Sequence, residues 1–206
     1  MNSTVLQLYL ITDRAAAGSR DLFTAVEQAI RGGVTMVQLR DKTLSAAALT
    51  ALAVELLSIT RRFHVPLIIN DYVDVMLEAD ADGAHLGAAD MDIRAARAKA
   101  GGKIIGATAK SRERIQAAFE AGADYVGVGP VFPSSTKPDA GKILGVDGLA
   151  ALTHGSPLPC VAIGGINPEN AELLRNAPVA GICAAGGILG RPDIFAAAQA
   201  MRQCRP

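Results

Sequence analysis

Short apolar runs alternate with helix-like stretches along nearly the whole chain, and this alternation restricts the fold more than any other feature. The runs are almost continuously apolar, which is typical of parallel strands covered on both faces. The intervening stretches have apolar residues three and four positions apart, and this spacing predicts amphipathic helices. The expected strands are 6–12, 36–40, 66–70, 83–87, 104–108, 125–130, 159–164 and 181–186. The expected helices are 22–31, 46–62, 73–78, 93–100, 111–121, 147–152, 168–176 and 192–203.

The number of these repeats favours a closed barrel. Eight strand–helix units in 206 residues leave about 26 residues for each unit, which is small but sufficient for a (β/α)8 TIM barrel. A doubly wound open sheet is the competing architecture, because it is built from the same units. No linker, low-complexity tract or change of composition divides the chain, so we expect one α/β domain over residues 1–206. Four helices are expected to begin after residues that commonly cap an N-terminus, namely Ser45, Asp92, Ser111 and Asn167.

The charge balance and composition restrict the partners of the protein. Lys and Arg number 20, Asp and Glu also number 20, and the formal net charge is zero. Proteins that bind nucleic acid or anionic membranes usually carry a basic excess instead. The chain is 50% hydrophobic, yet no apolar run reaches the roughly 18 residues of a membrane span. We therefore expect small-molecule partners, no nucleic acid and no membrane, and we leave the formation of a homo-oligomer open.

The first residues and the cysteines indicate a cytoplasmic protein. The start of the chain, Met-Asn-Ser-Thr, lacks the basic region and the long apolar stretch of a signal peptide. Cys160, Cys183 and Cys204 form no CxxC pair, which fits a reducing compartment. Cys160 and Cys183 lie in apolar runs and are expected to be small core residues.

Acidic side chains follow two neighbouring strands. Asp71 comes directly after the third run and Asp90 shortly after the fourth. The C-terminal ends of parallel strands meet at one rim of a barrel, where such enzymes carry their chemistry. Two carboxylates with no His or Cys cluster suit a hard cation such as Mg²⁺ beside phosphates. The alternative is that Asp71 belongs to a turn at the strand end and that Asp90 or Asp92 caps a helix.

Basic side chains and an amide gather at the same rim. Arg40 and Lys42 follow the second run two positions apart, Asn70 ends the third run, and Lys137 lies in a Ser/Thr-rich segment after the sixth. Arg binds phosphate oxygens through two N–H groups and Lys acts as a point charge, so these residues could hold a diphosphate together with a metal. The alternative is a solvated rim in which Asp41 pairs with a neighbouring residue.

Glycine pairs end the seventh and eighth runs. Gly164-Gly165 precedes an expected helix start at Asn167-Pro168, and Gly186-Gly187 ends the last run. Backbone N–H groups beside a helix start form an anion site, and the loops after the last two strands are the common phosphate site of such barrels. Two phosphate-binding regions on one rim predict two phosphorylated substrates. No expected strand holds a Lys for a Schiff base, and we interpret His85 as a satisfied core or rim histidine rather than a base.

With these features the sequence resembles the thiamine-phosphate synthase family. The resemblance runs from Leu8 to about Ile188 and includes the segment Met-Val-Gln-Leu-Arg-Asp-Lys that ends at Lys42. Several matching segments occur in the family's order, which makes the resemblance specific. They are residues 8–13, 32–42, 67–71, 73–74, 81–87, 90, 122–133, 136–137 and 161–166.

The resemblance implies a (β/α)8 barrel that joins hydroxymethylpyrimidine diphosphate to the phosphate of a hydroxyethyl thiazole, giving thiamine phosphate and pyrophosphate. It also implies a dissociative, Mg²⁺-assisted mechanism in which pyrophosphate leaves first. On this basis Gln38 and Thr108 contact the pyrimidine, and Asp71 and Asp90 bind Mg²⁺. The residues expected on the diphosphate are Arg40, Lys42, Asn70 and Lys137, of which Arg40, Lys42 and Lys137 are the expected catalytic residues. The residues expected on the thiazole phosphate are Ser134, Thr136, Gly165, Ala185 and Gly186.

The sequence departs from the family's pattern at three positions. Ala88 stands where the family often has Gln, Lys110 where many members have His, and Gly186 where the eighth strand often ends in Ser. The alternatives are a thiazole tautomerase and a barrel that binds a phosphate without catalysis and regulates a partner. A sugar-phosphate epimerase is compatible with the fold alone. The segment 132–145, rich in Pro, Ser and Gly, is expected to be a mobile lid.

Overall fold

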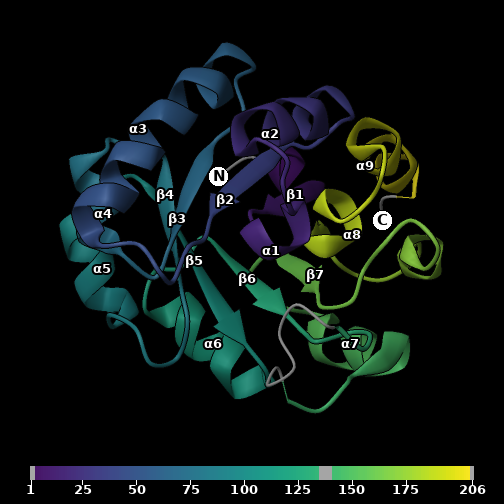
Figure 1. The fold of residues 1–206 in the computed structure, drawn as a ribbon. Coiled ribbons are helices and arrows are strands. Elements are labelled where there is room, and N and C mark those ends of the chain that lie inside the picture. The colour runs from purple at the N-terminus through teal and green to yellow at the C-terminus, as the bar shows by residue number, and fades with distance from the viewer. Residues whose placement is uncertain (1–2, 135–140, 205–206) are drawn as a thin grey trace.

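The computed structural model describes residues 3–134 and 141–204, and its strands close into a parallel barrel. Each strand pairs with the next along the chain, and β8 pairs with β1. The strands are β1 (Leu8–Ile11), β2 (Met36–Leu39), β3 (Leu67–Asn70), β4 (Gly83–Leu86), β5 (Ile104–Ala109), β6 (Tyr125–Val128), β7 (Cys160–Ile163) and β8 (Gly181–Ala184). Figure 1 shows the helices arranged around these central strands. The closed barrel confirms the expected TIM barrel and excludes the open sheet.

Helices cover the outside of the barrel between successive strands. The longer ones are α2 (Leu22–Arg31), α3 (Ala46–Arg62), α4 (Val73–Glu78), α5 (Ile93–Ala100), α6 (Arg112–Glu120), α7 (Gly145–Thr153) and α9 (Ile194–Gln203). Short turns of helix lie before β1, after β1 and after β8, namely η1 (Ser3–Leu6), α1 (Arg14–Ala17) and α8 (Gly186–Leu189). Because α8 begins at Gly186, β8 is shorter than the expected run. Ser45, Asp92 and Ser111 cap their helices as expected, each accepting a hydrogen bond from a backbone N–H of the first turn.

The helix expected over 168–176 is wrong in its extent. The structure has only a 3-10 turn there, η2 (Ala171–Leu174). The Asn167 side-chain oxygen accepts hydrogen bonds from the N–H groups of Glu169 at 3.0 Å and Asn170 at 3.2 Å. These bonds fold the residues after Asn167 into a tight turn, which competes with the start of a regular helix.

The barrel has an apolar core on each side of its sheet. Leu10 and Val37 point outward into the core beneath the helices, whereas their strand neighbours Tyr9 and Met36 point into the barrel. This alternation explains the almost continuously apolar runs, because both faces of each strand are buried. Cys160 and Cys183 are buried as expected. Within the described ranges, no helix has both the length and the apolar character needed to cross a membrane.

Candidate active site

The loops at the C-terminal end of the barrel surround a cavity of about 750 Å³. Its wall is formed by the ends of β1, β5, β6, β7 and β8 and residues that follow them, together with one residue of β4 and one from the loop after β2. A cavity of this size and position is where a barrel enzyme holds its substrates. The expected site residues that line it are Arg40, Thr108, Ser134, Gly165, Ala185 and Gly186.

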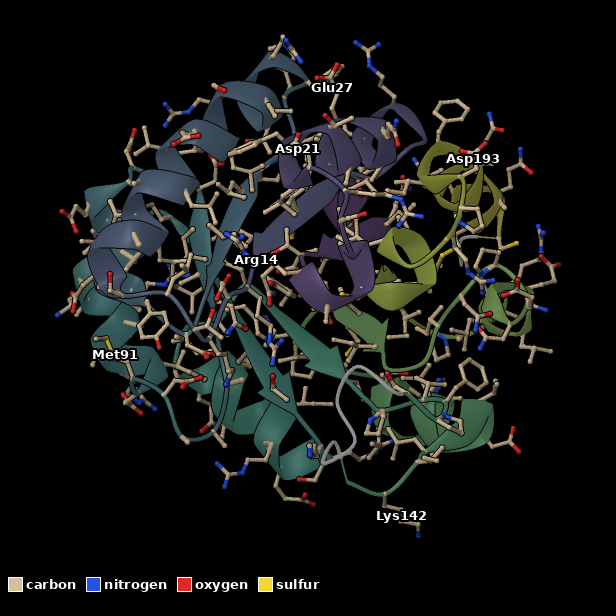
Figure 2. The ribbon with its side chains drawn as sticks, in the orientation of Figure 1. Arg14, Asp21, Glu27, Met91, Lys142 and Asp193 are labelled. Atoms are coloured by element: carbon tan, nitrogen blue, oxygen red, sulfur yellow. The ribbon has the colours of Figure 1, made fainter. Side chains whose placement is uncertain are left out.

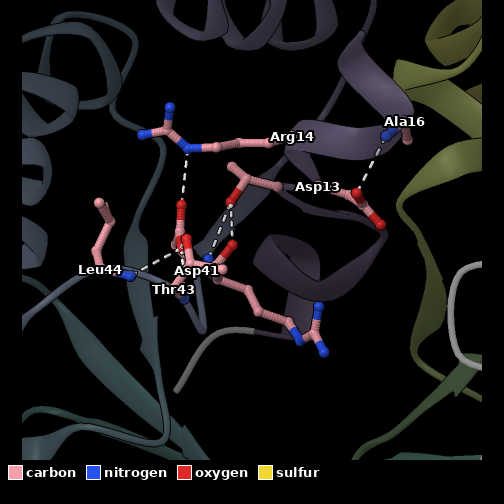
Figure 3. A network of polar contacts seen from close by, with 8 residues as sticks. Asp13, Arg14, Ala16, Asp41, Thr43 and Leu44 are labelled. Atoms are coloured by element: carbon pink, nitrogen blue, oxygen red, sulfur yellow. Dashed lines mark hydrogen bonds and ion pairs between the residues drawn. The ribbon is translucent and has the colours of Figure 1, made fainter.

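The Asp41 carboxylate holds the loop after β2 in place. One of its oxygens accepts hydrogen bonds from the backbone N–H and the hydroxyl of Thr43, at 2.9 and 2.7 Å, and the other accepts from Arg14 Nε at 2.7 Å (Figure 3). Burial acts to raise the pKa of Asp41, but these hydrogen bonds outweigh burial and hold the pKa below its usual range. Asp41 therefore does pair with its neighbours, and the pairing fixes the loop that begins with Arg40.

Arg40 is part of the cavity wall. Its backbone N–H donates to the Thr12 hydroxyl at 2.9 Å, and in the described ranges its guanidinium has no hydrogen bond or ion pair to a protein acceptor. Figure 2 locates this part of the molecule through Arg14, the partner of the adjacent Asp41. Arg14 is seen over the central strands, whereas Glu27 and Asp193 lie at the outer edge. An arginine at a cavity wall whose guanidinium makes no such contact can bind an anion through two parallel N–H groups.

The acidic side chains after β3 and β4 lie side by side. Lys42 Nζ is 3.4 Å from Asp71 Oδ2, and Asp90 Oδ2 accepts a hydrogen bond from the Gly87 N–H at 2.6 Å. Burial raises the pKa of Asp71, the adjacent Asp90 carboxyl raises this pKa further, and Lys42 lowers it by less. Because the Asp71 and Asp90 carboxyls are adjacent, they repel each other when both are ionised, so the pair suits a bound cation.

The Asp71 backbone adopts a conformation that residues other than glycine rarely take. Its φ is +66°, in the left-handed region. The Tyr72 N–H donates to the Asn70 carbonyl at 2.9 Å, so Asp71 also lies in the strand-end turn that was the alternative interpretation. Asp92, and not Asp90, caps α5. A strained turn of this kind at the end of a barrel strand is typical of functional sites.

The glycines after β7 let its loop pack directly on the segment that follows β6. Gly165 has a φ of +67°, and a Cβ added there would lie 2.3 Å from the Pro133 carbonyl oxygen. The Phe132 N–H donates to the Gly164 carbonyl at 3.0 Å and joins the two segments. This close packing brings Ser134 into the cavity wall beside the β7 loop.

The N-terminus of α8 lies against the same loop. A Cβ added to Gly187 would lie 2.1 Å from the Ile166 carbonyl oxygen. Within the part of the chain that the structure describes, the backbone N–H groups of Gly165, Gly186 and Gly187 donate no hydrogen bond to a protein acceptor. All three residues line the cavity. Backbone N–H groups gathered in this way form a site for an anion such as a phosphate.

Two other expected site residues, Gln38 and Asn70, do not line this cavity. Gln38 is buried in the barrel interior, where its Nε2 donates to the Tyr9 hydroxyl at 2.6 Å. Asn70 ends β3, in register with His85. Thr136 and Lys137 fall in the segment 135–140, outside the described residues. The lid expected over 132–145 includes this segment, so it stays a prediction.

Several cavity residues were not predicted as site residues. His85 lines the cavity and is hydrogen-bonded through both ring nitrogens, at 3.0 Å to the Tyr125 hydroxyl and at 3.0 Å to Thr108 Oγ1, which agrees with a satisfied rim histidine. Lys110 and Asn167 also line the cavity. The two-residue period of β5 is the signal that could have placed Lys110 beside Thr108.

Comparisons with known proteins agree with this geometry. A family model described as thiamine monophosphate synthase matches residues 8–188. The chain belongs to the thiamine monophosphate synthase family. A thiamine-phosphate synthase of Chloroflexus aurantiacus is 43% identical over 196 residues, covering 95% of this chain and 91% of that relative. A thiamine-phosphate synthase of Clostridium novyi is 43% identical, with coverages of 95% and 96%.

Solved structures support the thiamine monophosphate synthase family from the fold. The thiamine phosphate pyrophosphorylase from Pyrococcus furiosus has a TM-score of 0.89 and 35% identity, covering 98% of this chain and 96% of that chain. A 3-hexulose-6-phosphate synthase has a TM-score of 0.72 at 18% identity, a likeness that shows the fold alone. The family inferred from the sequence motifs is therefore confirmed.

Proposed function

We propose that this chain catalyses the thiamine-phosphate synthase reaction, joining 4-amino-2-methyl-5-(diphosphooxymethyl)pyrimidine to 4-methyl-5-(2-phosphooxyethyl)thiazole with release of pyrophosphate. The observation that carries the proposal is the division of the barrel mouth into two anion-binding regions. Basic and acidic side chains follow β2, β3 and β4, and backbone N–H groups face the cavity after β7 and β8. Membership of the family supports the same reaction. A tautomerase or a phosphate-binding regulator would not need the first region.

Asp71 and Asp90 would hold Mg²⁺ on the diphosphate side. Among the described residues no group of three or more His, Cys, Asp and Glu side chains could hold a metal, so the diphosphate and water would have to supply the remaining ligands. Mg²⁺ fits such a site, because it keeps several waters and usually takes one or two protein carboxylates beside phosphates. A cation would also relieve the repulsion that contributes to the raised pKa of Asp71. When bound, Mg²⁺ would neutralise charge on the diphosphate.

Arg40, Lys42 and Asn70 bind the diphosphate in this proposal. Arg40 offers two parallel N–H groups to the phosphate oxygens, and Lys42 already lies 3.4 Å from Asp71. Lys137 is added to this group on the strength of the resemblance. Together the cations stabilise the negative charge that grows on the leaving pyrophosphate, which is the largest contribution a protein makes to this kind of reaction.

The chemistry needs neither a strong base nor a nucleophile from the protein. The bond between the pyrimidine methylene carbon and the diphosphate oxygen breaks, and pyrophosphate leaves with the electron pair. The amino group of the pyrimidine stabilises the methylene cation, with Gln38 and Thr108 against the ring. The lone pair of the thiazole nitrogen then forms the new carbon–nitrogen bond. The protein therefore contributes charge stabilisation and alignment of the two substrates.

The N–H groups after β7 and β8 bind the thiazole phosphate in this proposal. Gly165, Ala185 and Gly186 contribute backbone, Ser134 contributes a hydroxyl at the cavity wall, and Thr136 is added from the resemblance. Gly186 lacks the hydroxyl that the family often has at this position. The backbone N–H groups remain, so we expect the phosphate site to be retained.

Gly165→Ala should weaken binding of the thiazole phosphate by about tenfold or more, as for the loss of one charge-assisted hydrogen bond. The added Cβ would lie 2.3 Å from the Pro133 carbonyl oxygen, so the β7 loop must shift. Gly155→Ala is a matched control, because Gly155 has a similar φ of +70° and nothing lies within 4 Å of its added Cβ. Both variants carry a left-handed alanine, which costs about 1–2 kcal/mol. Calorimetric titration that shows equal affinity in the two variants would remove Gly165 from the phosphate site.

The experiment that tests the proposed function is a direct assay. Purified protein is mixed with the pyrimidine diphosphate, the thiazole phosphate and Mg²⁺, with EDTA in the control reaction. We expect thiamine phosphate, identified by mass, and an equal amount of pyrophosphate, both dependent on the metal. A folded protein that binds the thiazole phosphate but makes no product would contradict the proposal and favour the tautomerase or the regulator.

The requirement for Mg²⁺ should depend on pH. Because burial and then the Asp90 carboxyl raise the pKa of Asp71, a proton competes with the metal at pH values above the ordinary aspartate pKa of about 3.9. The Mg²⁺ concentration needed for half-maximal activity should therefore rise as the pH falls through this raised pKa. Titrations of Mg²⁺ across a pH series measure the effect. A half-maximal concentration that stays constant down to the ordinary aspartate range would show that Asp71 does not ligate the metal.

A further inference from the structure

A chain of buried hydrogen bonds crosses the inside of the barrel below the cavity. It runs from Gln38 Nε2 to the Tyr9 hydroxyl at 2.6 Å, and from there to the Tyr125 hydroxyl at 2.8 Å. It continues from the Tyr125 hydroxyl to His85 Nδ1 at 3.0 Å, and from His85 Nε2 to Thr108 Oγ1 at 3.0 Å. The five residues come from five different strands, and we call them the interior chain. Gln38, Tyr9, Tyr125 and His85 are buried, and Thr108 lines the cavity.

The fold makes room for the interior chain at a cost in stability. A Cβ on Gly106 in β5 would lie 2.2 Å from Tyr125 Cζ and 2.4 Å from its hydroxyl oxygen. Glycine inside a strand is unfavourable, and the interior of such a barrel is ordinarily filled by branched apolar side chains. Buried polar groups also disfavour folding unless every one of them is hydrogen-bonded. Thr108 at one end of the chain lines the cavity, and Gln38 at the other end is the residue assigned to the pyrimidine in the proposed function. A polar chain kept under these conditions indicates a role in that site.

One arrangement of the hydrogens satisfies every link of the interior chain with all donors pointing the same way. In this arrangement the Gln38 amide nitrogen donates to the Tyr9 oxygen, and the Tyr9 hydroxyl donates to the Tyr125 oxygen. Tyr125 then donates to His85 Nδ1, which places the ring proton on Nε2, and Nε2–H donates to Thr108 Oγ1. Burial raises the pKa of Tyr9 and of Tyr125 above the ordinary value. Both side chains therefore stay protonated, and each hydroxyl can accept one hydrogen bond and donate another.

This direction defines what the two ends of the chain present to a ligand. Because the Gln38 nitrogen is engaged by Tyr9, the Gln38 amide oxygen is left to accept a hydrogen bond. Because Thr108 Oγ1 accepts from His85, the Thr108 hydroxyl hydrogen is left to donate. One end therefore offers an acceptor and the other a donor. This pattern matches an aminopyrimidine, whose amino group donates and whose ring nitrogens accept.

We propose that Tyr125, acting with Tyr9 and His85, is a positioning residue that selects an aminopyrimidine over an oxopyrimidine by fixing the orientation of the Gln38 amide and the Thr108 hydroxyl. The inference rests on the proposed function, which puts the pyrimidine between Gln38 and Thr108. An oxo group in place of the amino group would set a carbonyl oxygen against the Gln38 amide oxygen. Two acceptors facing each other repel, and each loses a hydrogen bond that it has in water.

Tyr125→Phe tests the inference because it removes the link at the middle of the interior chain. Without the Tyr125 oxygen, the Tyr9 hydroxyl can turn to donate to the Gln38 amide oxygen, and the amide then presents its nitrogen to the ligand. We expect the affinity for the 4-amino pyrimidine diphosphate to fall by about tenfold, as for one hydrogen bond. The affinity for its 4-oxo analogue should stay the same or rise. The ratio of the two dissociation constants, measured by calorimetry without thiazole, should therefore fall by about tenfold or more.

A matched control separates positioning from stability. Thr153→Val also removes one buried hydroxyl, because Thr153 Oγ1 donates to the Leu149 carbonyl at 2.9 Å in α7, outside the barrel. It should lower the melting temperature, as Tyr125→Phe does, and leave the amino-to-oxo ratio unchanged. Tyr9→Phe is a second test variant that breaks the interior chain at a different point, and it should lower the ratio as Tyr125→Phe does. Binding of the thiazole phosphate should not change in any of the three variants.

The tautomer of His85 tests the direction of the interior chain without any substrate. Long-range proton–nitrogen NMR correlations of the ligand-free wild type should show the proton on Nε2, and Tyr125→Phe should shift the tautomer balance. A proton on Nδ1 in the wild type would overturn the inference, as would an unchanged amino-to-oxo ratio in both tyrosine variants. A wild type that neither binds the aminopyrimidine nor forms product would overturn the proposed function as well. Wild-type binding with unchanged variant ratios would overturn this inference alone.

Discussion

Asp71→Asn should lower turnover by about 10²-fold or more, because it removes one of the two carboxylates proposed to bind Mg²⁺ at the leaving pyrophosphate. The reason is electrostatic, since the variant keeps the size and shape of the side chain and loses only the charge. Asp71 is also the residue whose pKa is raised by burial and by the Asp90 carboxyl. The measurement is the rate of pyrophosphate release at saturating substrates over a series of Mg²⁺ concentrations.

The same variant should be at least as stable as the wild type when no metal is present. The pKa of Asp71 in the folded protein lies above its value in the unfolded chain, so its ionised form disfavours folding. The free energy of unfolding therefore rises as the pH falls through the raised pKa, and Asp71→Asn removes this penalty at neutral pH. Stability and activity should thus change in opposite directions, as expected for a residue kept for function.

Asp74→Asn is the control for Asp71→Asn. Asp74 lies three residues further along in α4, is exposed, and pairs with Lys99 at 2.9 Å on the surface. A surface ion pair contributes about 0–1 kcal/mol, so this variant should keep its activity and its response to Mg²⁺. Near-normal turnover in Asp71→Asn, or an equal loss in Asp74→Asn, would contradict the metal-binding role of Asp71.

Arg40→Ala should lower turnover by about 10²–10³-fold, the usual effect of removing one preorganised donor from developing negative charge. Arg40 lines the cavity, and within the described ranges its guanidinium makes no hydrogen bond or ion pair with the protein. The variant therefore breaks no side-chain hydrogen bond or ion pair within the described ranges, and its melting temperature should change little. Binding of pyrophosphate with Mg²⁺, measured by calorimetry, should weaken in parallel with turnover.

Two further variants make the test of Arg40 specific. Arg40→Lys keeps the charge but loses the two parallel N–H groups, so it should recover only part of the activity. Arg112→Ala removes an exposed guanidinium that donates to the Ala151 carbonyl at 3.0 Å on the outside of the barrel, and its turnover should be normal. Full activity in Arg40→Lys would show that charge alone matters there, and full activity in Arg40→Ala would remove Arg40 from the site.

The rim of the site could be predicted because it depends on where strands end. Arg40, Asp71 and Gly165 each follow an apolar run, and a parallel barrel brings all such positions to one end. The role of Asp41 was left open between a solvated rim and a paired carboxylate, and the contact with Arg14 decided it. That contact joins α1 to the loop after β2, and the spacing of these segments along the chain does not reveal which side chains meet.

The chain's own periodicity determined the barrel, because strands buried on both faces and separated by helices leave few other ways to cover their apolar surface. Sequence also determined most helix starts, because a cap such as Ser45 acts within one turn. Only the tertiary structure decided which interior side chains touch. Tyr9 and Tyr125 lie 116 positions apart, and their hydroxyls meet because the closed barrel turns both strands toward one axis, where Gly106 leaves room for the ring. Hydrogen bonding between such distant residues has no local signal, because it depends on closure of the whole sheet.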